Sequence, residues 1–219
     1  MSMAIEELNV SGNIRLKGPI KIGHVKVSGA IVIDGSVDGN DIDVAGVMKI
    51  DGDLSVFSLD VAGAIRVSGL IRAKQIFVSG DIRSEKGIES ERIVVKGKAS
   101  SSYMKGIEIR LSGEMYIDRI IANKIYIAKD TEVRGSIEAC EIVVDRGAEI
   151  ERVYGRTIDI GRDAEIKIVE GENISIEKGA EVSLVRYVKS INIAKDVDIE
   201  KIERIEKISI DLEYCYHQP

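Results

Sequence analysis

Residues 25–41 read VKVSGAIVIDGSVDGND, a 17-residue unit that recurs with small changes from residue 8 onward. Within the unit, apolar and polar residues alternate over three short runs, and small residues separate the runs. Alternation with a period of two is typical of β-strands that point their apolar side chains to one side. A fixed short repeat predicts a solenoid, in which each unit forms one coil and needs its neighbours to bury its apolar residues.

The repeat sets the expected boundaries of the fold. Copies begin at Leu8, Val25, Ile42, Leu59, Ile76, Ile93, Ile109, Ile125, Ile142, Ile158, Ile174, Ile191 and Ile208. We therefore expect an all-β chain that folds as one parallel β-helix of about 12 coils of 16–17 residues, each with three short strands. The expected divisions are an N-terminal segment (1–7), the β-helix (8–210) and a C-terminal tail or cap (211–219).

Composition excludes several functional classes. The chain is 44% hydrophobic and 31% charged with only 4% aromatic residues, which suits a narrow core of branched aliphatic side chains. A net charge of −6 with interspersed signs offers no basic patch for nucleic acid. No apolar run is long enough to span a bilayer, and the start, MSMAIEELNV, lacks the features of a signal peptide. These observations predict a cytoplasmic protein.

The spacing of the two cysteines also favours a cytoplasmic location. Cys140 and Cys215 lie on coils about five apart, which places them roughly 24 Å from each other at ~4.8 Å per strand. A disulfide cannot span that distance. We therefore expect two free thiols, as in a reducing compartment.

The turn after the first run changes type midway along the chain. Through the seventh coil its fifth position is Gly, as at Gly29 and Gly46, whereas later coils carry turns such as KDTEV (129–133). Gly and Asp both tolerate positive φ. The later turns stack a basic column beside an acidic column, and we expect the two to neutralise each other; a charged binding stripe is the alternative. The basic column is Lys129, Arg146, Arg162, Lys178 and Lys195, and the acidic column is Glu132, Glu149, Glu165, Glu181 and Asp198.

Two further features interrupt the regular pattern. Ser84, Ala99 and Ser101 replace larger apolar residues, which indicates a loose or bulged coil, or a flexible joint. On the outward side of the first run, four apolar residues recur on nearby coils: Phe77, Val94, Tyr126 and Val143. Exposed apolar patches usually mark contacts, so we expect a lateral interface there. The enrichment in Ile, Lys and Glu is typical of a heat-stable protein.

Catalytic and metal-binding patterns are missing from the sequence. Neither His24 nor His217 has an evident nucleophile or metal-ligand partner, and no zinc, hydrolase or phosphate-binding motif occurs. Asp34, Asp51 and Asp53 are expected to form turns, with a Ca²⁺-binding carboxylate ladder as the alternative. We expect no cofactor, no metal and no enzymatic activity.

The stretches SGLIRAKQIFVSGDI (68–82) and DGSVDG (34–39) resemble the recurring G-x-I-x-A-x-x-V-x-V-x-G-x-I pattern of bactofilins, the polymer-forming cytoskeletal proteins. The resemblance is closest over residues 8–98. It implies a right-handed β-helix that assembles end to end into filaments without nucleotide. The family's Pro-rich tails are not present, and Met1, Met3 and Ile5 make only a weak candidate anchor, so membrane contact is doubtful.

These observations lead to one preferred function and two alternatives. The preferred function is a structural protein that forms filaments with copies of itself and acts as a scaffold for protein clients. The ends of the coil would mediate assembly, through Leu8 and Val10 at one end and Ile208, Ile210, Leu212 and Tyr214, at the start of a thirteenth coil, at the other. The alternatives are a non-polymerising scaffold or binding module, and a carbohydrate-active or acyl-transfer enzyme.

Overall fold

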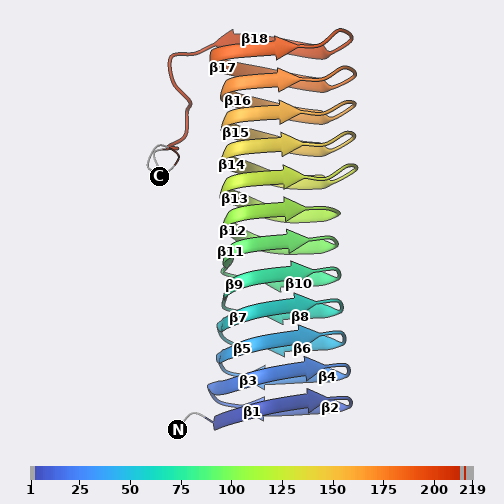
Figure 1. Cartoon of the computed structure of the whole chain (residues 1–219), viewed down its shortest axis with the longest axis vertical. Helices are drawn as coiled ribbons and strands as arrows, with labels where there is room; N and C mark the ends of the chain where they lie inside the picture. Colours follow the sequence, from blue (N-terminus) through green and yellow to red (C-terminus); the bar gives the residue numbers. More distant parts are fainter. Residues whose placement is uncertain (1–2, 213–214, 216–219) are drawn as a thin grey trace. The chain divides into compact units, whose positions relative to one another are not determined.

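The structure, a computed structural model, describes residues 3–212 and 215. The paired strands of these residues run parallel, as the repeat predicts, and form a β-solenoid of about 12 coils. The chain divides into two compact units, Met1–Gly106 (unit 1) and Ile107–Pro219 (unit 2). Figure 1 shows the successive coils of each unit, which are considered separately below.

Unit 1 contains two strands per coil. Its strands are β1 (Met3–Val10), β2 (Asn13–Lys17), β3 (Ile20–Val27), β4 (Ala30–Asp34), β5 (Val37–Val44), β6 (Val47–Ile50), β7 (Leu54–Val61), β8 (Ala64–Val67), β9 (Leu70–Val78), β10 (Asp81–Ser84), β11 (Gly87–Val95) and the first part of β12 (Lys98–Leu111). Each strand pairs with its equivalent one coil later, so that Val25 lies beside Ile42, and Ile42 beside Leu59.

Unit 2 contains one long bent strand per coil. Its strands are the end of β12, then β13 (Glu114–Ile127), β14 (Glu132–Val144), β15 (Glu149–Ile160), β16 (Glu165–Ile176), β17 (Glu181–Ile193) and β18 (Asp198–Arg204). The register again joins equivalent positions: Ile125 lies beside Ile142, Ile142 beside Ile158 and Ile158 beside Ile174.

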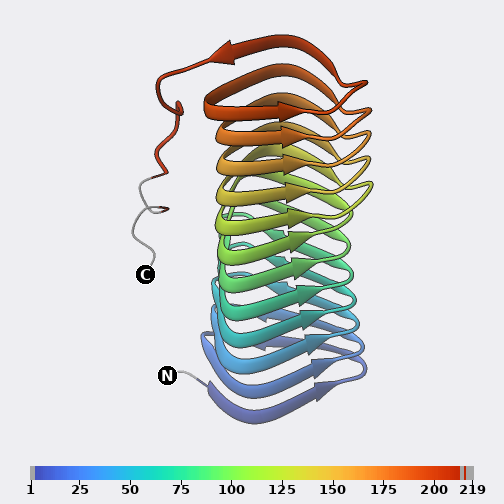
Figure 2. The ribbon, with the colours of Figure 1, turned by 45° about the horizontal axis from the view of Figure 1, so that its top comes forward.

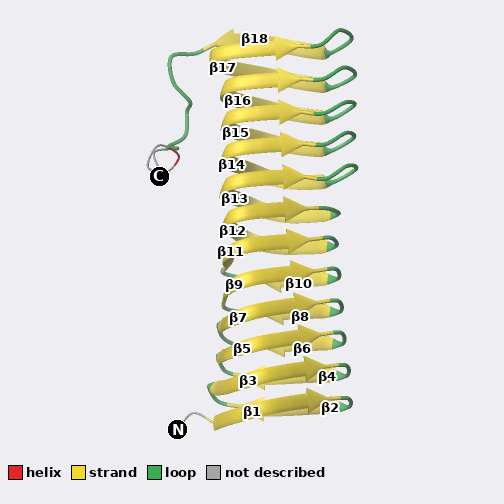
Figure 3. Ribbon diagram, viewed as in Figure 1, coloured by secondary structure: helices red, strands yellow, loops and turns green. Residues whose placement is uncertain are grey.

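The expected three short strands per coil are therefore merged. The third run of one repeat and the first run of the next form a single strand in both units, and in unit 2 the second run joins them as well (Figure 3). The reason is that the corner bends the strand without ending the hydrogen-bond ladder. A Cβ built on Gly171 would lie 2.8 Å from Ile158 Cδ1 and 2.9 Å from the Gly155 carbonyl oxygen. Only a very small residue fits at Gly171.

The core consists of the predicted stacked aliphatic columns. Ile42 and Val44 in unit 1 and Ile142 and Ile158 in unit 2 are at most 2% exposed. Burial of each such side chain contributes about 1.5–3 kcal/mol. Because the side-chain period is two, a shift of one residue would turn every one of these columns outward, and this fixes the register of the strands.

The two kinds of turn have different physical causes. Gly29 and Gly46 do not have positive φ; instead, a Cβ on Gly46 would lie 2.0 Å from the Gly29 carbonyl oxygen. Close stacking of successive turns therefore requires Gly in unit 1. In unit 2 the residue after the basic one does adopt positive φ, as at Asp130 (54°), Gly147 (66°) and Asp163 (55°). Positive φ thus occurs at Gly and Asp in the later turns and also at Gly113 (109°) of the earlier type, but not at Gly29 or Gly46.

The region around Ser84 is not a loose coil. Ser84 is 2% exposed, and its hydroxyl bonds to the Gly69 carbonyl oxygen at 2.7 Å and receives the Gly87 amide N–H at 3.0 Å. Tyr103 packs against Gly87, where a Cβ would lie 2.4 Å from the ring, and its hydroxyl donates to Glu89 at 2.6 Å. These hydrogen bonds satisfy Ser84 and Tyr103, whereas the buried Ser101 hydroxyl has no hydrogen-bond partner among the described residues.

Candidate functional site

The N-terminal coil of unit 1 leaves apolar residues uncovered. β1 pairs with β3 and β2 pairs with β4, and the outer edges of β1 and β2 have no strand partner within residues 3–212. Ile14 is 37% exposed and Leu8 is partly exposed, whereas Ile31, one coil further in, is 1% exposed. Val10 remains buried. The expected end site at Leu8 and Val10 thus lies on an open strand edge, the kind of edge that other chains can extend.

The last coil of unit 2 is also open, at different residues from those expected. β18 pairs with β17, and Ile202 of β18 lies beside Val185. Val185 is fully buried, whereas Ile202 is 47% exposed and Ile193, at the end of β17, is 37% exposed. Core positions therefore reach solvent at this edge.

The prediction of a thirteenth coil is wrong. Strand pairing ends at Arg204, and the following residues leave the coil and run back along the outside of unit 2 (Figure 2). Ile208 and Ile210 are half-buried in this segment and Leu212 is 5% exposed, while Tyr214 lies outside the described residues. Ile208, Ile210 and Leu212 line a hollow together with Glu172 and Val188, so they lie on the flank of unit 2 and do not extend its end. We call residues 205–212 and 215 the C-terminal strap.

The expectation of two free thiols is also wrong. Cys140 and Cys215 form a disulfide with their Cα atoms 5.4 Å apart. The distance estimate placed Cys215 on a further coil, but the strap returns past several coils and brings it to the level of β14. The even number of cysteines is the signal that could have suggested this.

Charged side chains line the face that the strap covers. Glu170 is 1% exposed and Glu172 is 6% exposed. A Glu170 carboxylate oxygen accepts the Ser209 amide N–H of the strap, and the other oxygen lies 3.6 Å from Arg186 Nη1. Glu172 accepts from Lys189 at 2.7 Å. Such buried carboxylates need partners, and the outward position of these residues in the repeat gave no indication that a strap would bury them.

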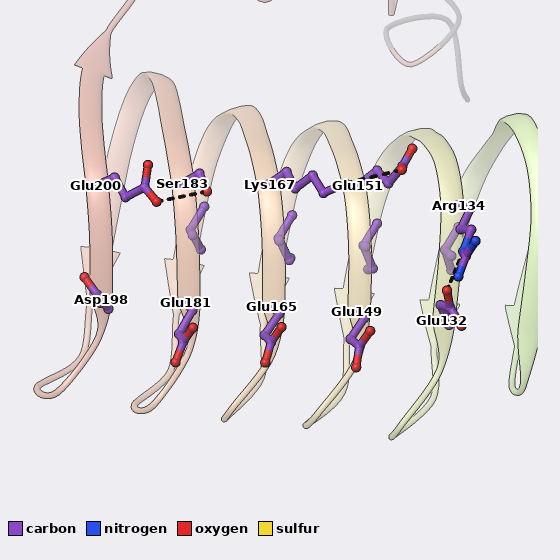
Figure 4. Close-up of a pocket in the computed structure, with 14 residues that line it drawn as sticks. Glu132, Arg134, Glu149, Glu151, Glu165, Lys167, Glu181, Ser183, Asp198 and Glu200 are labelled. Carbon is purple, nitrogen blue, oxygen red and sulfur yellow. Dashed lines mark hydrogen bonds and ion pairs between the residues drawn. The ribbon is translucent and has the colours of Figure 1, made fainter.

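The acidic column of unit 2 is present, but the basic column does not neutralise it. Figure 4 shows Glu132, Glu149, Glu165, Glu181 and Asp198 on successive coils, along a shallow groove of about 470 Å³. Glu132 is paired with Arg134 at 2.5 Å. Within the described residues, no ion pair joins this column to the basic one.

Arg162 of the basic column pairs with a carboxylate outside the acidic column. The residue that follows the basic one, such as Asp163, has positive φ and turns the chain between the two columns. Arg162 contacts Glu177, which precedes the next turn, at 3.3 Å. Glu149, Glu165, Glu181 and Asp198 are exposed, so this face carries a stripe of carboxylates.

The four outward apolar residues face solvent as expected. Each is partly exposed, and within unit 1 Phe77 lies beside Val94, with the Arg92 guanidinium 5.9 Å from the Phe77 ring centre. Within unit 2, Tyr126 lies beside Val143. The Tyr126 hydroxyl donates to Asp145 at 3.0 Å, and this bond raises the pKa of Tyr126 above its usual value of 10. The structure thus provides two apolar pairs, one on each unit.

The aspartates of the early turns serve the fold. Asp34 forms two hydrogen bonds with the Arg15 guanidinium, at 2.8 and 2.9 Å, and Arg15 lowers the pKa of Asp34. Asp51 accepts from the Ser68 hydroxyl, and Asp53 accepts the Leu70 amide N–H. The turn interpretation accounts for all three.

The remaining candidates for chemistry are few. His24 lies 3.0 Å from Asp41 on the exposed surface, and His217 lies outside the described residues. Across residues 3–212 and 215, no three His, Cys, Asp or Glu side chains form a group that could hold a metal ion. No helix in the described part of the chain is long and apolar enough to cross a membrane.

Comparison with known proteins gives no family to which the chain can be assigned. No family model matches it, and neither a curated protein nor a solved structure is significantly similar to it.

Proposed function

We propose that this protein is a structural scaffold that assembles with copies of itself through its open coil ends, in the manner suggested by its resemblance to bactofilins. The observation that carries the proposal is the exposure of core positions at both terminal coils: Ile14 and Leu8 on unit 1, and Ile193 and Ile202 on unit 2. Unpaired strand edges beside exposed core residues are a template for further strands, and natural proteins usually cover or charge them.

The chemistry of these edges explains why no nucleotide is needed. A second subunit that docks on β1 or β18 would satisfy backbone N–H and C=O groups and bury apolar area in one step. Each large aliphatic side chain that becomes buried contributes about 1.5–3 kcal/mol. Contact between identical ends gives a closed two-fold dimer, and contacts at both ends give a filament.

The location and partners follow from the same proposal. We propose a cytoplasmic scaffold whose partners are its own copies and protein clients. The paired cysteines no longer favour a reducing compartment, although disulfides do occur inside the cells of extreme thermophiles, and this agrees with the heat-stable composition.

A non-polymerising binding module is the second candidate. The observation that favours it is the stripe of carboxylates on unit 2, where Glu149, Glu165 and Glu181 lie in register on successive coils. A basic protein partner would find regularly spaced charges there, and its affinity would fall with added salt.

Charged substitutions at the ends separate the two candidates. We expect Ile14→Lys and Ile202→Lys each to shorten assemblies in negative-stain electron microscopy, because a charge at an end would have to be buried without a partner. Both residues are already exposed, so the far-ultraviolet circular dichroism spectrum should not change. Val47→Lys is the matched control, because Val47 is 50% exposed but lies away from the ends.

A wild-type chain that stays monomeric by light scattering over a wide range of concentration and salt would remove the assembly proposal. Salt-sensitive binding of a basic protein by that monomer would then support the binding module.

A further inference from the structure

The C-terminal strap contacts unit 2 at several points beyond the end of β18, beginning with the Ile205 amide N–H, which donates to the Tyr187 carbonyl oxygen at 2.9 Å. The Ser209 amide N–H donates to Glu170, and the Arg156 guanidinium donates to the Cys215 carbonyl oxygen at 3.1 Å. The disulfide between Cys215 and Cys140 links the strap covalently to β14. Leu212 is the one strap residue with a large apolar side chain that is nearly fully buried, at 5% exposure.

The surface beneath the strap is charged, so water can solvate it when the strap opens. Glu170 and Glu172 are almost completely buried by it, and Glu170 Oε2 has no hydrogen-bond partner among the described residues. If the strap lifts, these carboxylates gain water, and a buried carboxylate has much to gain from hydration. Opening the strap thus exposes Leu212 and at the same time gives water access to two carboxylates that keep Arg186 and Lys189 as ion-pair partners.

The strands at the level of the disulfide pair with one another and not with the strap. Cys140 lies on β14, which pairs with β13 on one edge and with β15 on the other. Its neighbours Ala139 and Ile142 are fully buried in the coil. Opening the strap leaves these ladders and this core unchanged.

We infer that the strap is a redox switch: the Cys140–Cys215 disulfide locks it over Glu170 and Glu172, and a thiol reductant releases it and uncovers this charged face. In the step itself, a reductant thiolate attacks one sulfur of the disulfide, and the other cysteine leaves as a thiolate. A second reductant thiol then displaces the first from the mixed disulfide. The protein gains two electrons and two protons as two thiols, and the reductant becomes a disulfide.

The size of the effect follows from the length of chain that the disulfide closes. About 11 residues connect the end of β18 to Cys215, and the entropy of closing a loop of that length changes the opening equilibrium by about 100-fold. Reduction should therefore raise the open population of the strap by about that factor. Reduction should not raise the fraction of molecules whose coils are unfolded.

Hydrogen exchange of the full chain tests the switch. The peptide that contains Ser209 should exchange about 100-fold faster in dithiothreitol than without it. Core peptides that contain Ile158 and Ile174 should keep their protection in both conditions. The double variant Cys140→Ser/Cys215→Ser should exchange like the reduced protein, with or without dithiothreitol.

Three results would overturn the inference. The first is equal exchange at Ser209 in the oxidised and reduced protein. The second is loss of protection at Ile158 and Ile174 on reduction, which would make the disulfide a staple of the fold and not a switch. The third is two reactive thiols in the unreduced protein after denaturation, which would mean that the disulfide does not form.

Discussion

Replacing Gly46 by Ala should destabilise unit 1 strongly, although the change adds one methyl group to a surface turn. The added Cβ would lie 2.0 Å from the Gly29 carbonyl oxygen and 2.7 Å from the Ser28 carbonyl oxygen. Both are backbone atoms, so neither can move aside without shifting the turn. The separation must grow by at least about 1 Å before the contact becomes tolerable.

That shift breaks two hydrogen bonds between the turns. The Gly46 N–H donates to the Val27 carbonyl oxygen at 2.8 Å, and the Val47 N–H donates to the Gly29 carbonyl oxygen at 2.9 Å. Each bond contributes about 0.5–1.5 kcal/mol, and the strain adds to this loss. We expect the free energy of unfolding to fall by about 2–4 kcal/mol, measured by urea denaturation with circular dichroism.

Gly12 is the matched control for this substitution. It occupies the same position of the repeat, on the first coil, and a Cβ there would meet nothing within 4 Å. Its φ is not positive either. Gly12→Ala should therefore be neutral or stabilise by up to about 1 kcal/mol, because Ala restricts the unfolded chain. Equal effects of the two substitutions would contradict the argument that turn stacking requires Gly.

Three further variants test the core register, the Tyr103–Glu89 hydrogen bond and the lateral apolar residues. Ile142→Asp should cost several kcal/mol because the carboxylate would be buried in the core without a partner; an unchanged melting temperature would show that the register is wrong. Tyr103→Phe should remove the hydrogen bond that holds the pKa of Glu89 below its usual 4.5. This depressed pKa contributes stability above pH 4.5 that is lost as the pH falls toward the folded-state pKa. The difference in unfolding free energy between wild type and Tyr103→Phe should therefore narrow below about pH 4.5 in acid denaturation. A difference that stays constant with pH would exclude this role of the hydrogen bond. The double change Phe77→Asp/Tyr126→Asp should leave the fold intact and alter lateral bundling or client binding, and wild-type assembly and binding would refute the lateral role.

The sequence predicted most of the solenoid because one local pattern dominates it. Alternating residues such as Ile142 and Val144 determine both the strand and its buried face, and the fixed repeat places each on its counterpart in the next coil. The outward position of Phe77 and Tyr126 follows from the same alternation.

The parts that sequence reasoning missed depend on contacts without a local signal. Cys140 and Cys215 are 75 residues apart, and their meeting depends on the path of the strap, which follows no repeat. Ile208 and Ile210 have the alternation of a strand and still leave the coil, because their segment packs on the flank of unit 2. The sequence shows the Gly column, but the reason for it in unit 1 is the short distance between successive turns, which has no signal in the sequence.

Self-assembly through the coil ends is the central claim, and electron microscopy of the purified wild-type protein beside Ile14→Lys and Ile202→Lys tests it most directly. The account predicts elongated assemblies of the wild type that form without nucleotide and become shorter in both variants, while Val47→Lys assembles as the wild type does. Single monomeric particles of the wild type at every concentration, or assemblies that all three variants form equally well, would contradict it.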